Sequence, residues 1–491
     1  MPRPVTITDT TLRDGQQSLW ATRMSTYEML PVADHLAASG VHSVDVIGTA
    51  SFDSAVRYLH EDPFERIRLL KERMPDTKLL GGHWGDSSWG FRRAPADVLA
   101  LQLDLFIESG IGGLRFMNGL MDHKALVNSA RRAKELGAEV IAPLVFSLSP
   151  VHTDELYERK AREYVELADA DCIMIKDSGG LLTPERVGSL VDAVRRGAGD
   201  RKVSLHSHCM TGLAPRVYMT ALEHGVDDLQ CTISPLSDAS ALPSTQMTLR
   251  NLRTAGYEVD VDLSEIEAAG EFLSHLAEST GRPVGRPVEY DHWHYTHQIP
   301  GGMLTNLRDQ LERANLIDRF DELLEEMARV RAEIGWPTIV TPYSQFIANQ
   351  AILNLIHGER YHVVPDQMKM YVLGYYGDLL ADPDPDVLDK IMGRGSSTIP
   401  ETPEPVPPAL PELRRLYPDA DDYELVMRYL CPEKEVDETI KMRGVAKEIT
   451  VGPRVGTRLS EVLGLLSEVA SNSWSGEMVV ENSGLRVRLR R

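Results

Sequence analysis

The first 240 residues alternate short β-branched runs with longer amphipathic stretches, and this alternation restricts the fold more than any other feature of the chain. It is typical of strand–helix units repeated around a parallel sheet. Glycines such as Gly40 and Gly137 close helical stretches just before the next run. The strand candidates are residues 5–8, 41–47, 78–81, 113–117, 139–142, 171–175, 203–206 and 228–232.

Eight such units predict an α/β chain that folds as a (β/α)8 TIM barrel. The alternative fold is a doubly wound open sheet, which often carries a GxGxxG motif after its first strand. No such motif follows residues 5–8. We therefore expect the barrel, with helices over stretches such as 95–109 and 154–167.

The pattern changes after about residue 300, where the strand signal fades and helical patterns cover 306–331, 342–357 and 366–376. We expect a barrel over 1–300, a mainly helical domain over 301–443 and a small C-terminal region over 444–491. The stretch 382–420 is rich in Pro and acidic residues, and its composition predicts a linker-like segment without regular structure.

The charge of the chain excludes several classes of partner. Lys and Arg number 52 against 73 Asp and Glu, a net charge of −21, which repels nucleic acid and anionic membrane surfaces. The four cysteines are scattered without CxxC spacing, so they predict neither a disulfide framework nor a thiolate zinc site. With no apolar leader or membrane-length run, we expect a cytoplasmic protein.

Polar residues at the ends of three strand candidates predict a metal site, because catalytic groups of a TIM barrel gather at the C-terminal ends of its strands. His206 and His208 are two residues apart and so project from the same face of a strand. Asp14 adds a carboxylate, and two imidazoles with one carboxylate suit zinc or manganese. The alternative is a pair of interior histidines that hydrogen-bond without a metal.

Lys176 ends the sixth strand candidate, and its ammonium group cannot bind a metal. If burial lowers its pKa, the neutral amine can add carbon dioxide and become a carbamate ligand. The alternative is a salt bridge to Asp14 or Asp177. A second histidine group, His292, His294 and His297, lies beyond the barrel pattern, and we expect a structural or supporting role for it.

Six motifs together resemble the carboxyltransferase component of biotin-dependent enzymes, namely the oxaloacetate decarboxylase α subunit, the pyruvate-binding subunit of transcarboxylase and the carboxyltransferase domain of pyruvate carboxylase. They occur in the family's order between residue 5 and about 430. The motifs are ITDTTLRDGQQSLWATRM (7–24), SPVHT (149–153), IKDSGGLLTPE (175–185), LHSHCMTGL (205–213), HQIPGGMLTNLRDQL (297–311) and TPYSQFIANQAILNLIHGERY (341–361).

The resemblance implies a barrel capped by a helical funnel, and a metal, most simply zinc with manganese or cobalt as alternatives. The implied ligands are Asp14, carbamylated Lys176, His206 and His208. It also implies that Thr305 carries a proton between the acceptor and biotin, and that Arg13 and Gln17 line the keto-acid pocket.

The resemblance further implies an activity and partners. The chain would move a carboxyl group between carboxybiotin and a pyruvate- or oxaloacetate-like acceptor through a metal-stabilised enolate. It lacks the Ala-Met-Lys-Met biotin attachment sequence and a Gly-rich nucleotide loop. We therefore expect biotin on a separate carrier protein, a separate biotin carboxylase, and a homodimer or higher oligomer.

Departures from the family pattern point to a changed acceptor pocket. Gly81 stands where relatives have an arginine that binds the substrate carboxylate, which predicts that pyruvate is a weak acceptor unless another arginine compensates. Arg115, Arg92 and Arg93 are the candidates, and we take Arg115 as a substrate-binding residue. Two alternative functions are a biotin-independent metal-dependent lyase or Claisen-type condensing enzyme on the same barrel, and a non-catalytic scaffold subunit.

Overall fold

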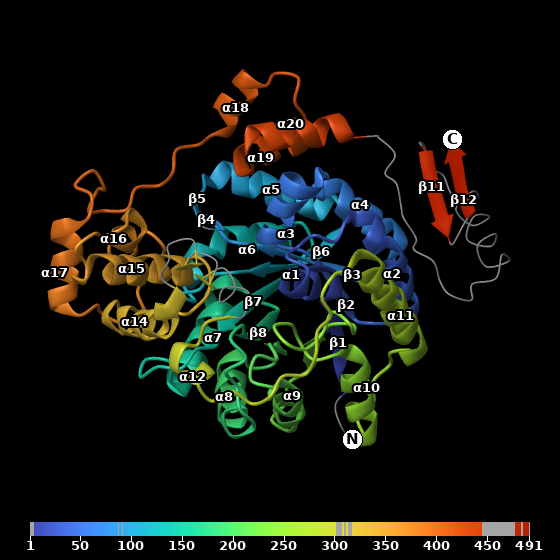
Figure 1. Ribbon diagram of the computed structural model, residues 1–491, viewed down its shortest axis with the longest axis horizontal. Helices are drawn as coiled ribbons and strands as arrows, with labels where there is room; N and C mark the ends of the chain where they lie inside the picture. Colours follow the sequence, from blue (N-terminus) through green and yellow to red (C-terminus); the bar gives the residue numbers. More distant parts are fainter. Residues whose placement is uncertain are drawn as a thin grey trace.

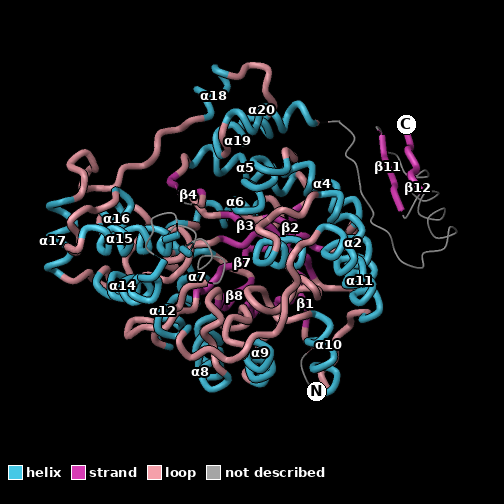
Figure 2. Tube along the Cα trace, viewed as in Figure 1, coloured by secondary structure: helices cyan, strands magenta, loops and turns pink. Residues whose placement is uncertain are grey.

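The computed structural model describes residues 4–86, 88–90, 92–300, 307–308, 311–312, 317–443, 477–482 and 485–490. Eight parallel strands close into a barrel at the centre of the molecule, and helices surround them (Figure 1 and Figure 2). The strands pair in the order β1-β10-β9-β8-β7-β6-β3-β2, which confirms the TIM-barrel prediction. They are β1 (Thr6–Asp9), β2 (Ser43–Ile47), β3 (Lys78–His83), β6 (Ile111–Phe116), β7 (Glu139–Val145), β8 (Cys172–Asp177), β9 (Lys202–Ser207) and β10 (Asp228–Cys231).

Local sequence signals set the ends of the surrounding helices. Ser25 and Glu28 form a capping box before α2, which ends at the left-handed Gly40. Thr183 caps α8 and Pro184 occupies its first turn, where a missing N–H costs nothing. The helices are α2 (Thr26–Ser39), α4 (Pro63–Arg73), α5 (Ala96–Glu108), α6 (Val127–Glu135), α7 (Asp154–Ala168), α8 (Pro184–Ala198), α9 (Ala214–Glu223), α10 (Thr245–Thr254) and α11 (Leu263–Thr280).

Several short elements lie between the barrel strands and the longer helices. They are two π-helices, η1 (Thr11–Gly15) and η2 (Ala55–Leu59), the 3-10 turn η3 (His123–Ala125), the helices α1 (Gln16–Leu19), α3 (Thr49–Ser54) and α12 (His294–His297), and the hairpin strands β4 (Ser88–Trp89) and β5 (Arg92–Arg93).

The barrel core has two layers, because successive strand residues point to opposite faces. Leu80, Ile141, Cys172 and Met174 form a small apolar cluster of inward-facing side chains. A much larger cluster fills the space between the strands and the helices. Above the inner apolar cluster, toward the C-terminal strand ends, the interior becomes polar and carries the candidate site.

A second body of helices packs beside the barrel, at the left of Figure 1, around its own hydrophobic cluster. The elements are η4 (Ile317–Arg319), α14 (Phe320–Glu333), α15 (Tyr343–His357), α16 (Asp366–Val372) and α17 (Pro385–Arg394). Arg331 of α14 donates to the Leu148 carbonyl at 3.1 Å and to Ser147 Oγ at 3.0 Å. These bonds anchor the helical body on the loop that follows β7.

The prediction of a linker without regular structure over 382–420 is wrong in part. Asp384 caps α17 and Pro385 begins it, so this acidic Pro segment is a helix start. After residues 395–409, the chain returns to the barrel as α18 (Leu410–Leu416), α19 (Asp422–Leu430) and α20 (Glu433–Met442). Val426, Met427 and Val436 of these helices belong to the barrel's own hydrophobic cluster.

Near the C-terminus, β11 (Glu477–Asn482) pairs with β12 (Leu485–Arg490) in antiparallel fashion. Among the helices that the structure describes, none is both long and apolar enough to cross a membrane.

Candidate active site

A buried π-helix places Asp14 over the barrel. β1 leads into η1, and Thr11 at its start donates from its backbone N–H and its hydroxyl to Asp9 at 2.9 and 3.0 Å. A Cβ on Gly15 would lie 2.8 Å from the Leu236 carbonyl oxygen, so only glycine fits where the turn passes this close. Local π-type windings are frequent at functional sites.

Asp14, His206 and His208 form a group whose ligand atoms lie within 4.8 Å of one another. Because these three residues could hold a metal ion, they are called the metal group below. Nε2 of His206 lies 3.5 Å from one carboxylate oxygen of Asp14, and Nε2 of His208 lies 3.6 Å from the other. All three residues are buried. The predicted ligands from the ends of two strands, β1 and β9, are thus close together.

The orientation of the imidazoles fits a cation. Nδ1 of His208 lies 2.6 Å from the Ser240 carbonyl, which can only accept, so this nitrogen carries the hydrogen and Nε2 carries a lone pair. Nδ1 of His206 lies 2.7 Å from Oε1 of Gln230. The two Nε2 atoms are 3.1 Å apart, and two lone pairs at that distance repel unless a cation or proton lies between them.

Burial and neighbouring charges set the protonation states of these three residues. Burial alone would raise the pKa of Asp14, but Arg13 and the two imidazoles hold it well below its usual value. Burial lowers the pKa of both His206 and His208, and Lys176 lowers them further. Near neutral pH the site therefore offers a carboxylate and two neutral imidazoles.

Lys176 lies on β8 with Nζ 3.0 Å from Nε2 of His206. Burial, reinforced by Arg13, lowers the pKa of Lys176 to about 7, so a large fraction of the amine is neutral at physiological pH. The alternative salt bridge to Asp177 is wrong. Asp177 faces the other way and accepts from the backbone N–H groups of Leu181 and Leu182 at 2.8 and 2.9 Å.

Two arginines share one carboxylate beside the metal group. Asp45 on β2 accepts from Arg13 Nε at 2.6 Å and from Arg115 NH2 at 2.7 Å, and Arg13 NH1 also donates to Asp14 at 2.5 Å. Among the described residues, NH2 of Arg13 and Nε of Arg115 are buried without a hydrogen-bond partner. Buried donors are almost always satisfied, so these two predict an anionic ligand.

The interpretation of Gly81 as a vacated anchor does not fit the geometry. A Cβ on Gly81 would point at Ile47 and Ile111, at 3.2 and 3.4 Å, in the apolar layer between strands and helices. A Cβ on Gly82 would instead lie 3.4 Å from NH2 of Arg115. Gly82, and not Gly81, therefore faces Arg115.

The other two arginines considered as replacements are engaged elsewhere. Arg92 donates to the Tyr429 carbonyl and Arg93 to the Glu404 carbonyl, each at 2.5 Å. Both acceptors belong to the segment that returns from the helical body to the barrel. Of the three candidates, only Arg115 joins the cluster that contains Asp45.

The remaining predicted residues have different positions. Gln17 lies in α1, just after the π-helix, and is partly exposed. Thr305 lies outside the described residues. His294 is bonded to the Gly179 carbonyl at 2.5 Å, and His297 accepts from the Ile299 N–H at 3.1 Å. In the described part of the chain, only Asp14, His206 and His208 form a metal-type cluster, so the second histidine group has structural contacts.

Sequence reasoning missed Asp45 and Gln230, although both carried a signal. Each is a polar residue within a strand whose neighbours are apolar, in SVDVI and in DLQC, and each is buried. A buried polar side chain in such a strand needs a partner inside the barrel. Here the partners are the guanidiniums for Asp45 and His206 for Gln230.

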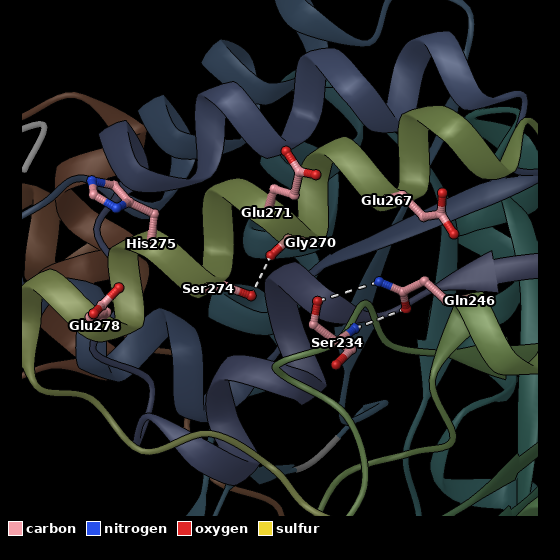
Figure 3. Close-up of a pocket in the computed structure, with 8 residues that line it drawn as sticks. All are labelled: Ser234, Gln246, Glu267, Gly270, Glu271, Ser274, His275 and Glu278. Carbon is pink, nitrogen blue, oxygen red and sulfur yellow. Dashed lines mark hydrogen bonds between the residues drawn. The ribbon is translucent and has the colours of Figure 1, made fainter. Parts of the chain in front are cut away.

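A separate pocket lies on the outer side of the barrel, between α10, α11 and the loop at Ser234 (Figure 3). Three glutamates of α11, Glu267, Glu271 and Glu278, line it with His275. The glutamine Gln246 is bonded to the backbone of Ser234. This pocket is distinct from the buried metal group and contains none of its residues.

Comparisons with known proteins point to one family. Residues 295–461 match the model of the conserved carboxylase domain, and residues 121–273 match the HMGL-like model. The chain is similar to a pyruvate carboxylase subunit of Methanocaldococcus jannaschii, with 36% identity over 427 residues, which is 86% of this chain and 74% of that protein.

Two further proteins show the range of relatives. The methylmalonyl-CoA carboxyltransferase 5S subunit of Propionibacterium freudenreichii subsp. shermanii is 32% identical over 84% of this chain and 81% of its own length. The carboxyl transferase domain of Rhizobium etli pyruvate carboxylase, solved with pyruvate and biocytin, superposes with a TM-score of 0.82 over 90% of this chain and 78% of that one. At 24% identity, this last likeness shows the shared fold.

Proposed function

This chain belongs to the carboxyltransferase components of biotin-dependent enzymes, and from that premise we propose that it moves a carboxyl group between carboxybiotin on a separate carrier protein and a keto-acid acceptor. The observation that carries the proposal is the pair of unpartnered guanidinium donors, on Arg13 and Arg115, directly beside the Asp14 metal group. A keto acid offers a carboxylate that can accept from both donors.

The residues present fit a divalent metal. Asp14, His206 and His208 would hold it, with zinc the first expectation and manganese or cobalt the alternatives. Such an ion would supply positive charge that stabilises negative charge on the oxygen of an enolate.

Lys176 is proposed as a fourth ligand after carbamylation. The neutral amine attacks carbon dioxide, a C–N bond forms, and one proton is released, which leaves a carbamate anion at a buried position. The lowered pKa of about 7 supports this reaction because only the neutral amine is nucleophilic. The position of Nζ, 3.0 Å from the metal-facing nitrogen of His206, supports it by geometry.

The arginines are proposed to bind and orient the acceptor. Asp45 holds Arg13 and Arg115 side by side, and their free N–H groups can donate to one carboxylate. Gly82 faces NH2 of Arg115, where a Cβ would lie 3.4 Å from that nitrogen. Pyruvate is therefore the proposed acceptor, with oxaloacetate as the carboxyl donor in the reverse direction. A further candidate acceptor is 2-oxoglutarate, because a relative from Hydrogenobacter thermophilus is named 2-oxoglutarate carboxylase large subunit.

Thr305 is proposed as the proton carrier between acceptor and biotin, and Gln17 as a residue of the pocket rim. The partners are a biotinylated carrier protein, a biotin carboxylase and a second copy of the chain. The relative from Methanocaldococcus jannaschii is named as one subunit of a pyruvate carboxylase, which supports an assembly of several polypeptides. The match of residues 295–461 to the conserved carboxylase domain favours this activity over a biotin-independent lyase.

The test combines metal analysis with turnover. Purified chain is supplied with a biotinylated carrier, and carrier-dependent decarboxylation of oxaloacetate is compared with carboxylation of pyruvate and 2-oxoglutarate from carboxylated carrier. We expect His206→Ala to lose most of its metal and its transfer activity. Turnover that does not depend on biotin would support the lyase instead, and full metal content in His206→Ala would refute the proposed ligand set.

A further inference from the structure

A hydrogen-bonded chain runs through the barrel interior from the metal group toward the opposite end. Gln230 lies on β10 with Oε1 2.7 Å from Nδ1 of His206. Its amide nitrogen faces the sulfur of Met174 at 3.0 Å and Oγ of Ser204 at 3.4 Å. Ser204 in turn donates to Asp228 at 2.8 Å. All of these side chains are buried.

The carboxylate at the end of this chain sets its direction. Asp228 can only accept, and it receives hydrogens from Thr6 at 2.7 Å, from Thr8 at 2.9 Å and from Ser204. Because Ser204 has one hydroxyl hydrogen and gives it to Asp228, its oxygen presents a lone pair to Gln230. Nζ of Lys202 also lies 3.6 Å from a carboxylate oxygen of Asp228.

The amide of Gln230 then has one acceptable orientation. Its NH2 group must face Ser204 and the thioether of Met174, both of which accept, and its carbonyl must face His206. The reverse orientation would place the carbonyl against two atoms that have no hydrogen to give. A carbonyl at Nδ1 requires that nitrogen to carry the hydrogen, so the lone pair of His206 is on Nε2.

We propose that Gln230, oriented by Ser204 and Asp228, is a positioning residue that holds His206 in the tautomer whose Nε2 binds the metal. His208 needs no such chain, because its Nδ1 faces a backbone carbonyl, which cannot rotate into a donor. His206 faces a side-chain amide that can present either a donor or an acceptor. The inference rests on the metal centre proposed above.

The first experiment measures zinc affinity of the full chain by competition with a coloured chelator. Gln230→Leu should weaken binding by about 10- to 100-fold, the usual effect of losing a partner of a metal-bound histidine. Gln230→Glu should bind within a few-fold of the parent, because a carboxylate oxygen still accepts from Nδ1. The control is Gln102→Leu, which removes another buried amide, on α5, that has no partner among the described residues.

Two outcomes of that experiment would overturn the inference. One is unchanged zinc affinity in folded Gln230→Leu, and the other is an equal loss in Gln230→Leu and Gln230→Glu, which would indicate a packing role. A parent that binds no zinc would instead contradict the metal centre.

The second experiment needs no metal and decides the inference by itself. Imidazole ¹⁵N shifts are recorded on metal-free, histidine-labelled protein, with the His206 signals assigned by their loss in His206→Ala. The parent should show protonated Nδ1 and unprotonated Nε2. Ser204→Ala should move the shifts toward a mixture of tautomers, because the amide is then free to turn. Parent shifts that report protonated Nε2 would overturn the inference, and so would a Ser204→Ala spectrum identical to the parent's.

Discussion

Replacing Asp45 with asparagine tests whether one buried carboxylate organises the substrate pocket. In the parent, the guanidiniums of Arg13 and Arg115 are balanced by Asp14 and Asp45, and the Asp45 side chain is 1% exposed. Asp45→Asn leaves one buried positive charge uncompensated and turns an NH2 group toward one guanidinium. Breaking a buried ion pair in this way costs about 3–5 kcal/mol of the free energy of unfolding.

The matched control is Asp34→Asn, which makes the same chemical change in an exposed ion pair. Asp34 lies 3.1 Å from Arg73, with side chains 49% and 39% exposed. Solvent screens this pair, so its loss should cost at most about 1 kcal/mol. The contrast between the two variants isolates the effect of burial, since the substitution itself is identical.

The assay is urea unfolding of the metal-free chain. It measures the midpoint urea concentration and the slope of the unfolding transition of the barrel. We expect Asp45→Asn to lower the midpoint strongly at an unchanged slope, and Asp34→Asn to shift it little. In the active complex, Asp45→Asn should also raise the KM for the keto acid, because the two N–H donors are no longer held together. Equal midpoints for the two variants would refute the reasoning.

Three further results are expected. Thr305→Ala should keep its metal and its stability but lose about 10²- to 10⁴-fold in transfer rate, while Thr305→Ser retains activity; a melting temperature that falls with near-normal turnover would indicate a helix cap instead. Gly119→Ala should cost about 1–3 kcal/mol of the free energy of unfolding, because its Cβ would overlap the ring of Tyr343. The control is Gly393→Ala in α17, where a Cβ meets no atom within 4 Å, and it should raise the urea midpoint or leave it unchanged. Burial raises the pKa of Asp9 to about 7, so the folded state holds a proton that the unfolded state releases near pH 4, and stability falls as pH rises from about 4 to about 7 by up to about 4 kcal/mol. In Asp9→Asn, the fall in stability with rising pH should be smaller than in the parent. Denaturation midpoints of both proteins at about pH 4.5 and about pH 7.5 measure this difference.

Local patterns in the sequence were sufficient for the elements of the barrel and for the metal group. Alternation within strands and capping residues before helices depend on neighbours only a few residues away, so strands such as β8 and helices such as α7 were predictable. The same alternation places His206 and His208 on one face. The rule that strand ends converge then brings Asp14 and Lys176 to them.

Contacts between distant segments depend on how the barrel closes, and the sequence does not display that closure. Asp45 meets Arg115 across 70 residues, and Gln230 meets His206 across 24. The resemblance placed Gly81 at the position of a substrate-binding arginine, but the direction of its Cβ depends on how β3 packs against Ile47 and Ile111 of the neighbouring strands.

The return of α18–α20 to the barrel was equally hidden, because their apolar faces suit either hydrophobic cluster and only tertiary packing selects one. The chemistry of the site thus follows from residue types and strand ends. The orientation of each functional group follows from partners that lie far away along the chain. A side chain's rotamer and tautomer are decided by the atoms around it in space.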